Sequence, residues 1–94
     1  MIVILDEPLI PCIEILRRAF PGGVSSGERR VLMASIYDEF SDRNLASLLS
    51  TFLDMNSHVA LREAISAWQD LGGSKEVSDM RNYLAKMGWE FDCD

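Results

Sequence analysis

Serines and glycines punctuate this chain at intervals that fit short helices. Three serines stand immediately before apolar stretches, where their hydroxyl groups can accept hydrogen bonds from the first backbone N–H groups of a helix. Three glycine positions follow such stretches, where a helix can end in a left-handed turn. The serines are Ser25, Ser41 and Ser74, and the glycines are Gly22, Gly72 and Gly88. This punctuation predicts an all-α fold, a compact bundle of four to five short helices.

Between these signals, apolar residues recur at steps of three and four, which places them on one face of a helix. The five stripes are Leu9, Cys12, Ile13, Leu16 and Phe20; Leu32, Met33, Ile36, Tyr37 and Phe40; Leu45, Leu48, Leu49, Phe52 and Leu53; Leu61, Ile65 and Trp68; and Val77, Met80, Leu84 and Met87. The third stripe is unbroken and predicts a central core helix. On the fourth helix Ala60, Ala64 and Ala67 form a flat flank beside the stripe.

Two junctions carry further local signals. Ser25 and Glu28 have the spacing of a capping box, so a helix should begin near residue 26. Ser41 follows the second stripe directly, and we therefore expect the helices on either side of it to meet at a sharp angle. Length and composition predict a single domain that spans residues 1–94, because 48% apolar and 26% charged residues are typical of a folded globular protein.

The two ends of the chain are rich in apolar residues. Ile2 and Ile4 lie in a short apolar arm, and Trp89 and Phe91 lie in an aromatic tail beyond the last helix. The arm and the tail could pair as a two-stranded ribbon, although an isolated pair of strands is marginally stable. We expect the tail to fold back onto the bundle.

The order of these turns and caps resembles a known family. The residues that carry the resemblance are 15–24, with their Phe-Pro-Gly-Gly-Val turn; 40–45, with their Ser-Asp cap; and 76–89, with their closing Gly-Trp. They resemble an actinobacterial family of small helical proteins, common in mycobacteria, which is catalogued as a domain of unknown function. Arg29 and Arg30, and the apolar arm, depart from the family's pattern. The resemblance implies a helical bundle and no functional residue.

Charge and cysteine usage limit the possible partners and location. The net charge is −6, which disfavours attraction to phosphate backbones and anionic membranes. No stretch approaches the roughly 20 apolar residues of a membrane span, and the first residues lack the basic leader of a signal peptide. Cys12 and Cys93 show no metal-binding spacing, and a disulfide between them is possible but unsupported. A cytoplasmic location is expected.

The sequence offers little catalytic chemistry. His58 follows Ser57, but a nucleophile and base also need an orienting group and an oxyanion site, so a helix N-terminus is the preferred interpretation. Asp38, Glu39 and Asp42 lack the ligand pattern of a calcium loop. The glycines have no phosphate-loop spacing. We expect no enzyme activity, no cofactor, no metal site and no small-molecule substrate.

Two kinds of binding protein remain. Arg17, Arg18, Arg29 and Arg30 flank one turn, and the sharp junction at Ser41 permits a helix-turn-helix, so a DNA-binding regulator is the alternative. Its recognition helix would carry few cations, and nucleic acid is not the expected partner. The favoured hypothesis is a non-enzymatic module that binds another protein or itself. The candidate partner-binding residues are Ile2, Ile4, Trp68, Trp89 and Phe91.

Overall fold

The computed structural model describes residues 9–90, which form five α-helices and one short 3-10 helix and contain no strand. The elements are α1 (Ile10–Ala19), α2 (Ser26–Ile36), η2 (Tyr37–Glu39), α3 (Asp42–Leu53), α4 (Ser57–Leu71) and α5 (Lys75–Lys86). The predicted all-α fold of short helices is therefore confirmed. The arm–tail ribbon concerns residues outside the described range.

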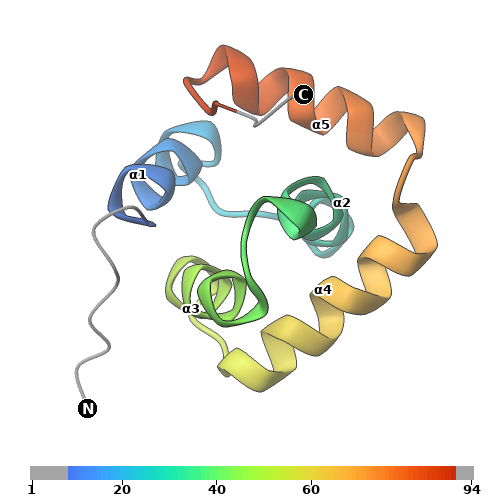
Figure 1. Cartoon of the computed structure of the whole chain (residues 1–94). Coiled ribbons are helices and arrows are strands. Elements are labelled where there is room, and N and C mark those ends of the chain that lie inside the picture. The colour runs from blue at the N-terminus through green and yellow to red at the C-terminus, as the bar shows by residue number, and fades with distance from the viewer. Residues whose placement is uncertain (1–8, 91–94) are drawn as a thin grey trace.

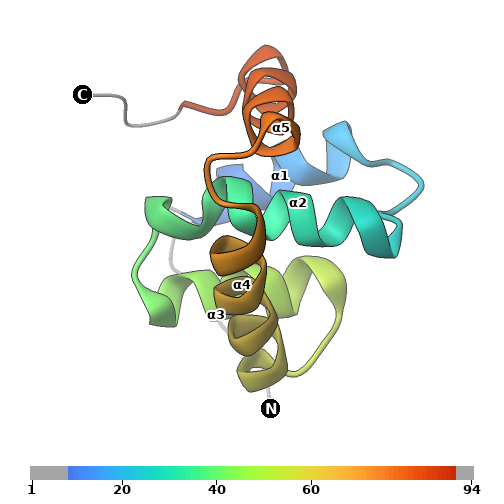
Figure 2. The same ribbon diagram turned by 90° about the vertical axis from the view of Figure 1, so that its right-hand side faces the viewer.

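The helices are arranged in two crossing directions. In Figure 1, α1, α2 and α3 are seen nearly end-on, while α4 and α5 run across them. After a 90° turn (Figure 2), α2 and α3 lie across the view, α5 is seen nearly end-on and α4 runs steeply across α2 and α3, so the two sets cross at steep angles. Helix α2 lies in the middle, packed against α4 and α5, and α1 bridges α3 and α5. The bundle is therefore orthogonal rather than a set of parallel rods.

The predicted caps are present. The Ser25 hydroxyl accepts a hydrogen bond from the Glu28 N–H, and the Glu28 carboxylate accepts one from the Ser25 N–H, both at 3.2 Å. The Ser41 and Ser74 hydroxyls cap α3 and α5 by accepting hydrogen bonds from the Asn44 and Val77 N–H groups. Asn56 caps α4 through its side-chain oxygen. Because each cap satisfies backbone N–H groups that no helical carbonyl can reach, the helix starts follow from local sequence.

Helix α2 is the most completely covered helix, and the third stripe, on α3, contributes three fully buried residues to the core. Five consecutive α2 residues, Leu32 to Ile36, are fully buried, so the end of this helix is covered on all sides. Among them is Ser35, whose hydroxyl donates a hydrogen bond to the Val31 carbonyl at 2.7 Å. On α3, by contrast, Leu45, Leu48 and Leu49 are buried but Phe52 and Leu53 are half-buried.

Helix α4 enters the core by its small residues. Ala60, Ala64 and Ala67 are fully buried, whereas Leu61 and Ile65 of the predicted stripe are half-buried. Because α4 packs on both α2 and α3, the alanine face allows the helices to approach closely. The larger residues cover the edges of this contact.

The chain reverses its direction at the junction before Ser41. Helix α2 ends at Ile36, and η2 carries the chain around to an extended Phe40 before Ser41. As a result, α2 and α3 run in nearly opposite directions (Figure 2). The second apolar stripe thus continues past the end of the α-helix and brings Tyr37 and Phe40 to the side of the core.

Candidate functional site

The structure separates the predicted partner-binding residues. Ile2, Ile4 and Phe91 lie outside the described residues. Trp68 is on α4 and Trp89 follows α5, and the two tryptophans line different hollows. Trp89 marks the candidate site, because it lies at the floor of a groove beside both ends of the described chain.

The end of α5 aims Trp89 back toward the core. Gly88 has a φ of 109°, a left-handed conformation that a side chain would strain. The Trp89 N–H donates to the Leu84 carbonyl at 2.9 Å, and the Gly88 N–H donates to the Ala85 carbonyl at 3.1 Å. These two bonds form a Schellman motif, in which the residue after the glycine packs on the last helical turn. Trp89 is accordingly only 5% exposed.

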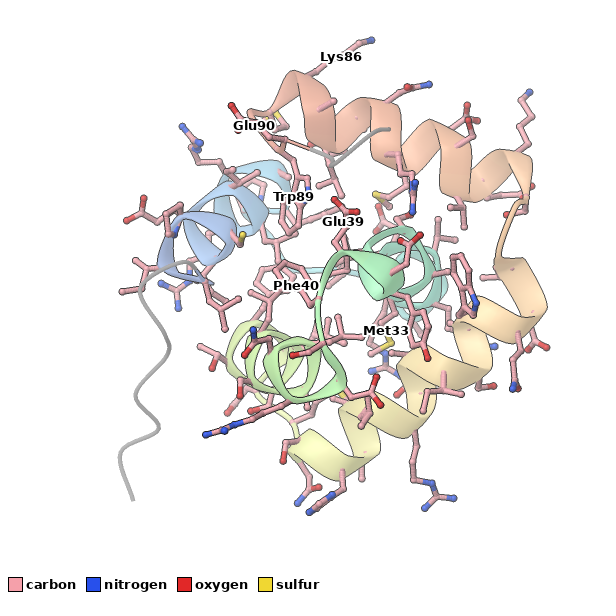
Figure 3. All side chains as sticks on the ribbon, viewed as in Figure 1. Met33, Glu39, Phe40, Lys86, Trp89 and Glu90 are labelled. Atoms are coloured by element: carbon pink, nitrogen blue, oxygen red, sulfur yellow. The ribbon has the colours of Figure 1, made fainter. Side chains whose placement is uncertain are left out.

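Phe40 meets Trp89 from the other side. Its backbone is extended between η2 and the Ser41 cap, which places its side chain against the bundle. The two rings pack edge to face, with centroids 6.0 Å apart and planes at 90°. Figure 3 shows them meeting between α1 and the α2–α3 connection, whereas Lys86 on α5 points away.

These residues belong to a groove that we call the terminal groove, with a volume of about 590 Å³. Its lining is Pro11, Cys12, Ile15, Glu39, Phe40, Gly88, Trp89 and Glu90. Helix α1 supplies the aliphatic wall, the aromatic pair supplies the floor, and the carboxylates of Glu39 and Glu90 give the lining a negative charge. Because Pro11 is near the first described residue and Glu90 is the last, the groove lies beside both ends of the described range.

Two further features act on this end of the bundle. Arg18 donates a hydrogen bond to the Met87 carbonyl at 3.4 Å, which satisfies a carbonyl at the α5 C-terminus. Burial raises the pKa of the Cys12 thiol, because the anionic thiolate is poorly solvated in the wall of the groove. The wall therefore presents a neutral thiol and an aliphatic side chain to a ligand.

Trp68 lies in a different environment. Its ring stacks on Tyr37, with centroids 5.3 Å apart and planes at 21°. The hollow beside it contains the salt bridge between Arg81 and Asp38 at 2.7 Å. Arg81 also donates from Nε to the carbonyl of buried Ser35 at 3.0 Å. This arginine joins α5 to the end of α2, so the contacts around Trp68 stabilise the fold.

The arginines proposed for DNA contact are largely engaged within the protein. Arg29 pairs with Glu63 at 2.8 Å and Arg30 with Asp70 at 2.7 Å, so α2 is linked to α4 by two salt bridges. A helix-turn-helix also joins its helices at roughly 90–120°. The nearly antiparallel α2 and α3 differ from that geometry.

The remaining polar candidates lie at helix junctions. His58 is exposed in the first turn of α4, and its backbone N–H donates a hydrogen bond to the Asn56 side-chain oxygen at 2.9 Å. Asp38 forms the salt bridge with Arg81 described above. Within residues 9–90, no group of three or more His, Cys, Asp or Glu side chains could hold a metal ion. In the same range, no helix is long and apolar enough to cross a membrane.

Sequence reasoning did not assign Cys12, Ile15 and Phe40 to the groove. Cys12 and Phe40 were placed in the core stripes, and Ile15 was not singled out. The three-residue spacing of Cys12 and Ile15 could have indicated a second face of α1, because the buried residues Ile13 and Leu16 have the same spacing one position along. No protein-family model, curated protein or solved structure matches the chain. The resemblance to the actinobacterial family stays a prediction.

Proposed function

We propose that this protein is a non-enzymatic helical module that binds another protein, and that the terminal groove receives an apolar side chain of the partner. The observation that carries the proposal is the aromatic floor of the groove, where Trp89 and Phe40 pack edge to face beneath open space. Concave sites with a few large apolar anchors concentrate binding energy in protein interfaces.

The rigidity of the groove supports this proposal. The Schellman motif and the edge-to-face contact hold Trp89 in one position, so little side-chain freedom is lost when a partner binds. The wall formed by Ile15 and Cys12 offers aliphatic contact, and the carboxylate of Glu90 lies at the rim. A cytoplasmic location and membership of the actinobacterial family are parts of the same proposal and rest on the sequence.

Site-specific crosslinking tests the proposal. A benzophenone amino acid would replace Pro11 or Glu90 at the groove, or Gln69 on the exposed side of α4 as the matched control. On irradiation in cells, both groove positions should yield the same discrete product, and position 69 should not. A product with the mass of two chains would identify the partner as a second copy.

A second variant links the product to the groove wall. Ile15→Gln makes the aliphatic wall polar without removing a large side chain, so it should abolish the crosslink while circular dichroism shows an intact fold. No product, or products of equal yield from all three positions, would refute binding at the groove.

A further inference from the structure

A second surface, distinct from the terminal groove, combines exposed apolar side chains with a ring of negative charge. We call it the Tyr83 hollow, and its volume is about 410 Å³. Its apolar floor is formed by Phe20, Met80 and Tyr83, and its rim by Glu28, Glu76 and Asp79. Within the described residues, no lysine or arginine lines it.

Tyr83 is the exposed part of the floor, and its ring is held in place by two contacts. Tyr83 is 40% exposed, although its ring packs edge to face on Phe20 with centroids 5.8 Å apart. Its hydroxyl donates a hydrogen bond to the Ala19 carbonyl, which anchors the far end of the ring to α1. The ring is therefore held at both ends while one part of it remains open to solvent. An aromatic ring fixed in this way can bind a partner at low entropic cost.

The acidic rim follows from the register of α5. Glu76, Asp79, Met80 and Tyr83 are spaced at three, four and seven residues from the first, so they share one face of the helix. Val77 and Leu84, by contrast, are buried on the neighbouring face against the core. Helix α5 thus has a core stripe and a second, solvent-facing stripe that mixes apolar and acidic groups.

Glu28 closes the rim from the start of α2. One of its carboxylate oxygens accepts the Ser25 N–H in the capping box, which fixes the position of the side chain. A carboxylate has about four acceptor sites, so Glu28 can accept a further hydrogen bond from a cation. Carboxylates from two helices therefore surround one apolar floor.

The charge of this surface selects its partner. A second copy docked on it by two-fold symmetry would bring the same carboxylates against each other, which is unfavourable. Anionic membranes and nucleic acids would be repelled for the same reason. We propose that the Tyr83 hollow binds a cationic amphipathic segment of another protein, with an apolar side chain on Tyr83 and Met80 and flanking Lys or Arg residues against Glu28, Glu76 and Asp79.

Synthetic peptides of about 15 residues, long enough to become helical, provide the probes. The first carries Leu on one face and Lys on the flanks, the second replaces Leu with Ser, and the third replaces Lys with Glu. Binding is measured by fluorescence anisotropy, and the position of the peptide by NMR of methionine methyl groups. The first peptide should bind with micromolar affinity, and its binding should weaken at high salt. The other two should bind at least tenfold more weakly.

The location is tested with matched charge variants. Glu76→Gln with Asp79→Asn should weaken binding about fivefold or more, whereas Glu14→Gln with Asp54→Asn, which removes the same charge at exposed positions outside both surfaces, should have little effect. The Met80 methyl resonance should shift on binding, and that of Met55 should not. All four substituted side chains are exposed, so the variants should stay folded.

Three results would overturn the inference. These are equal binding of the Leu and Ser peptides, equal losses in the two charge variants, and an unchanged Met80 methyl resonance. If Glu90→Gln loses binding and the Glu76 and Asp79 variant does not, the peptide occupies the terminal groove. The Tyr83 hollow would then be rejected while the proposed function stands. Conversely, the crosslinking at Pro11 and Glu90 can fail without affecting the result at Tyr83.

Discussion

Replacing Ala64 with leucine should be among the most damaging conservative changes in this protein. Ala64 is fully buried on the alanine face by which α4 packs against α2 and α3. A leucine there adds a branched side chain where the helix backbones approach closely. The matched control is Ala85→Leu, because Ala85 is exposed on α5 and the same atoms are added in solvent.

The expected magnitude follows from overpacking. Extra methylene groups in a packed core cost about 1–3 kcal/mol, and a leucine at Ala64 should reach the upper part of this range. For a domain of about 60–100 residues, a loss of ~3 kcal/mol lowers the Tm by about 12–24 °C. The exposed control should change the free energy of unfolding by less than about 0.5 kcal/mol.

Urea denaturation followed by circular dichroism measures both variants, with Tm from thermal melts of the same samples. A parallel pair, Leu48→Ala and Leu61→Ala, compares a fully buried leucine with a half-buried one, and the first should cost more. If Ala64→Leu is as stable as Ala85→Leu, the alanine face does not form the tight contact described, and the packing of α4 must differ.

Further outcomes are expected for two glycine variants, one cap variant and the Cys12 thiol. Gly72→Ala should lower the free energy of unfolding by about 1–2 kcal/mol, because its Cβ would lie 2.5 Å from the Trp68 carbonyl oxygen. In Gly27→Ala the Cβ meets nothing within 4 Å, and the helix should gain about 0.5–1 kcal/mol; equal effects in both variants would contradict the geometry. Ser25→Ala removes the capping box and should cost about 1 kcal/mol in urea denaturation, and an unchanged midpoint would show that the cap adds nothing. Finally, burial raises the pKa of Cys12, so iodoacetamide should modify it more slowly in the folded than in the unfolded chain, as followed by mass spectrometry of its peptide. An iodoacetamide rate in the folded chain equal to that in the unfolded chain would contradict this expectation. The protonated Cys12 thiol should contribute a constant amount to stability below the ordinary thiol pKa, and this contribution should decline as the pH rises from there toward the raised pKa.

The all-α fold and several helix boundaries could be predicted from the sequence because they depend on local chemistry. A serine hydroxyl at residue 25, 41 or 74 bonds to a backbone N–H three residues away, and this requires no tertiary contact. The left-handed turn at Gly88 is local in the same sense. For this reason the starts of α2, α3 and α5 and the end of α5 follow from the residues alone. The end of α2 does not, because the second apolar stripe runs on to Phe40 although the α-helix ends at Ile36.

The tertiary structure decided which faces of these helices are buried. Helix α4 offers both a large apolar stripe and an alanine flank, and periodicity favours the larger residues. Ala64 is nevertheless in the core and Leu61 is half-buried, because close packing on two neighbouring helices requires a small side chain at the contact. The central position of α2 also depends on tertiary packing, since no local sequence pattern indicates how many helices surround it.

The terminal groove and the Tyr83 hollow also exist only in three dimensions. Phe40 and Trp89 are 49 positions apart in the sequence, and they meet because η2 reverses the chain while the Schellman motif turns it back after α5. Tyr83 meets Phe20 only because α1 and α5 pack together. The sequence alone determined the all-α fold and the starts of α2, α3 and α5, because hydrogen bonds to neighbouring residues set those points. Only the packing of the helices decided which side chains line a binding surface, because such contacts join residues that are distant along the chain.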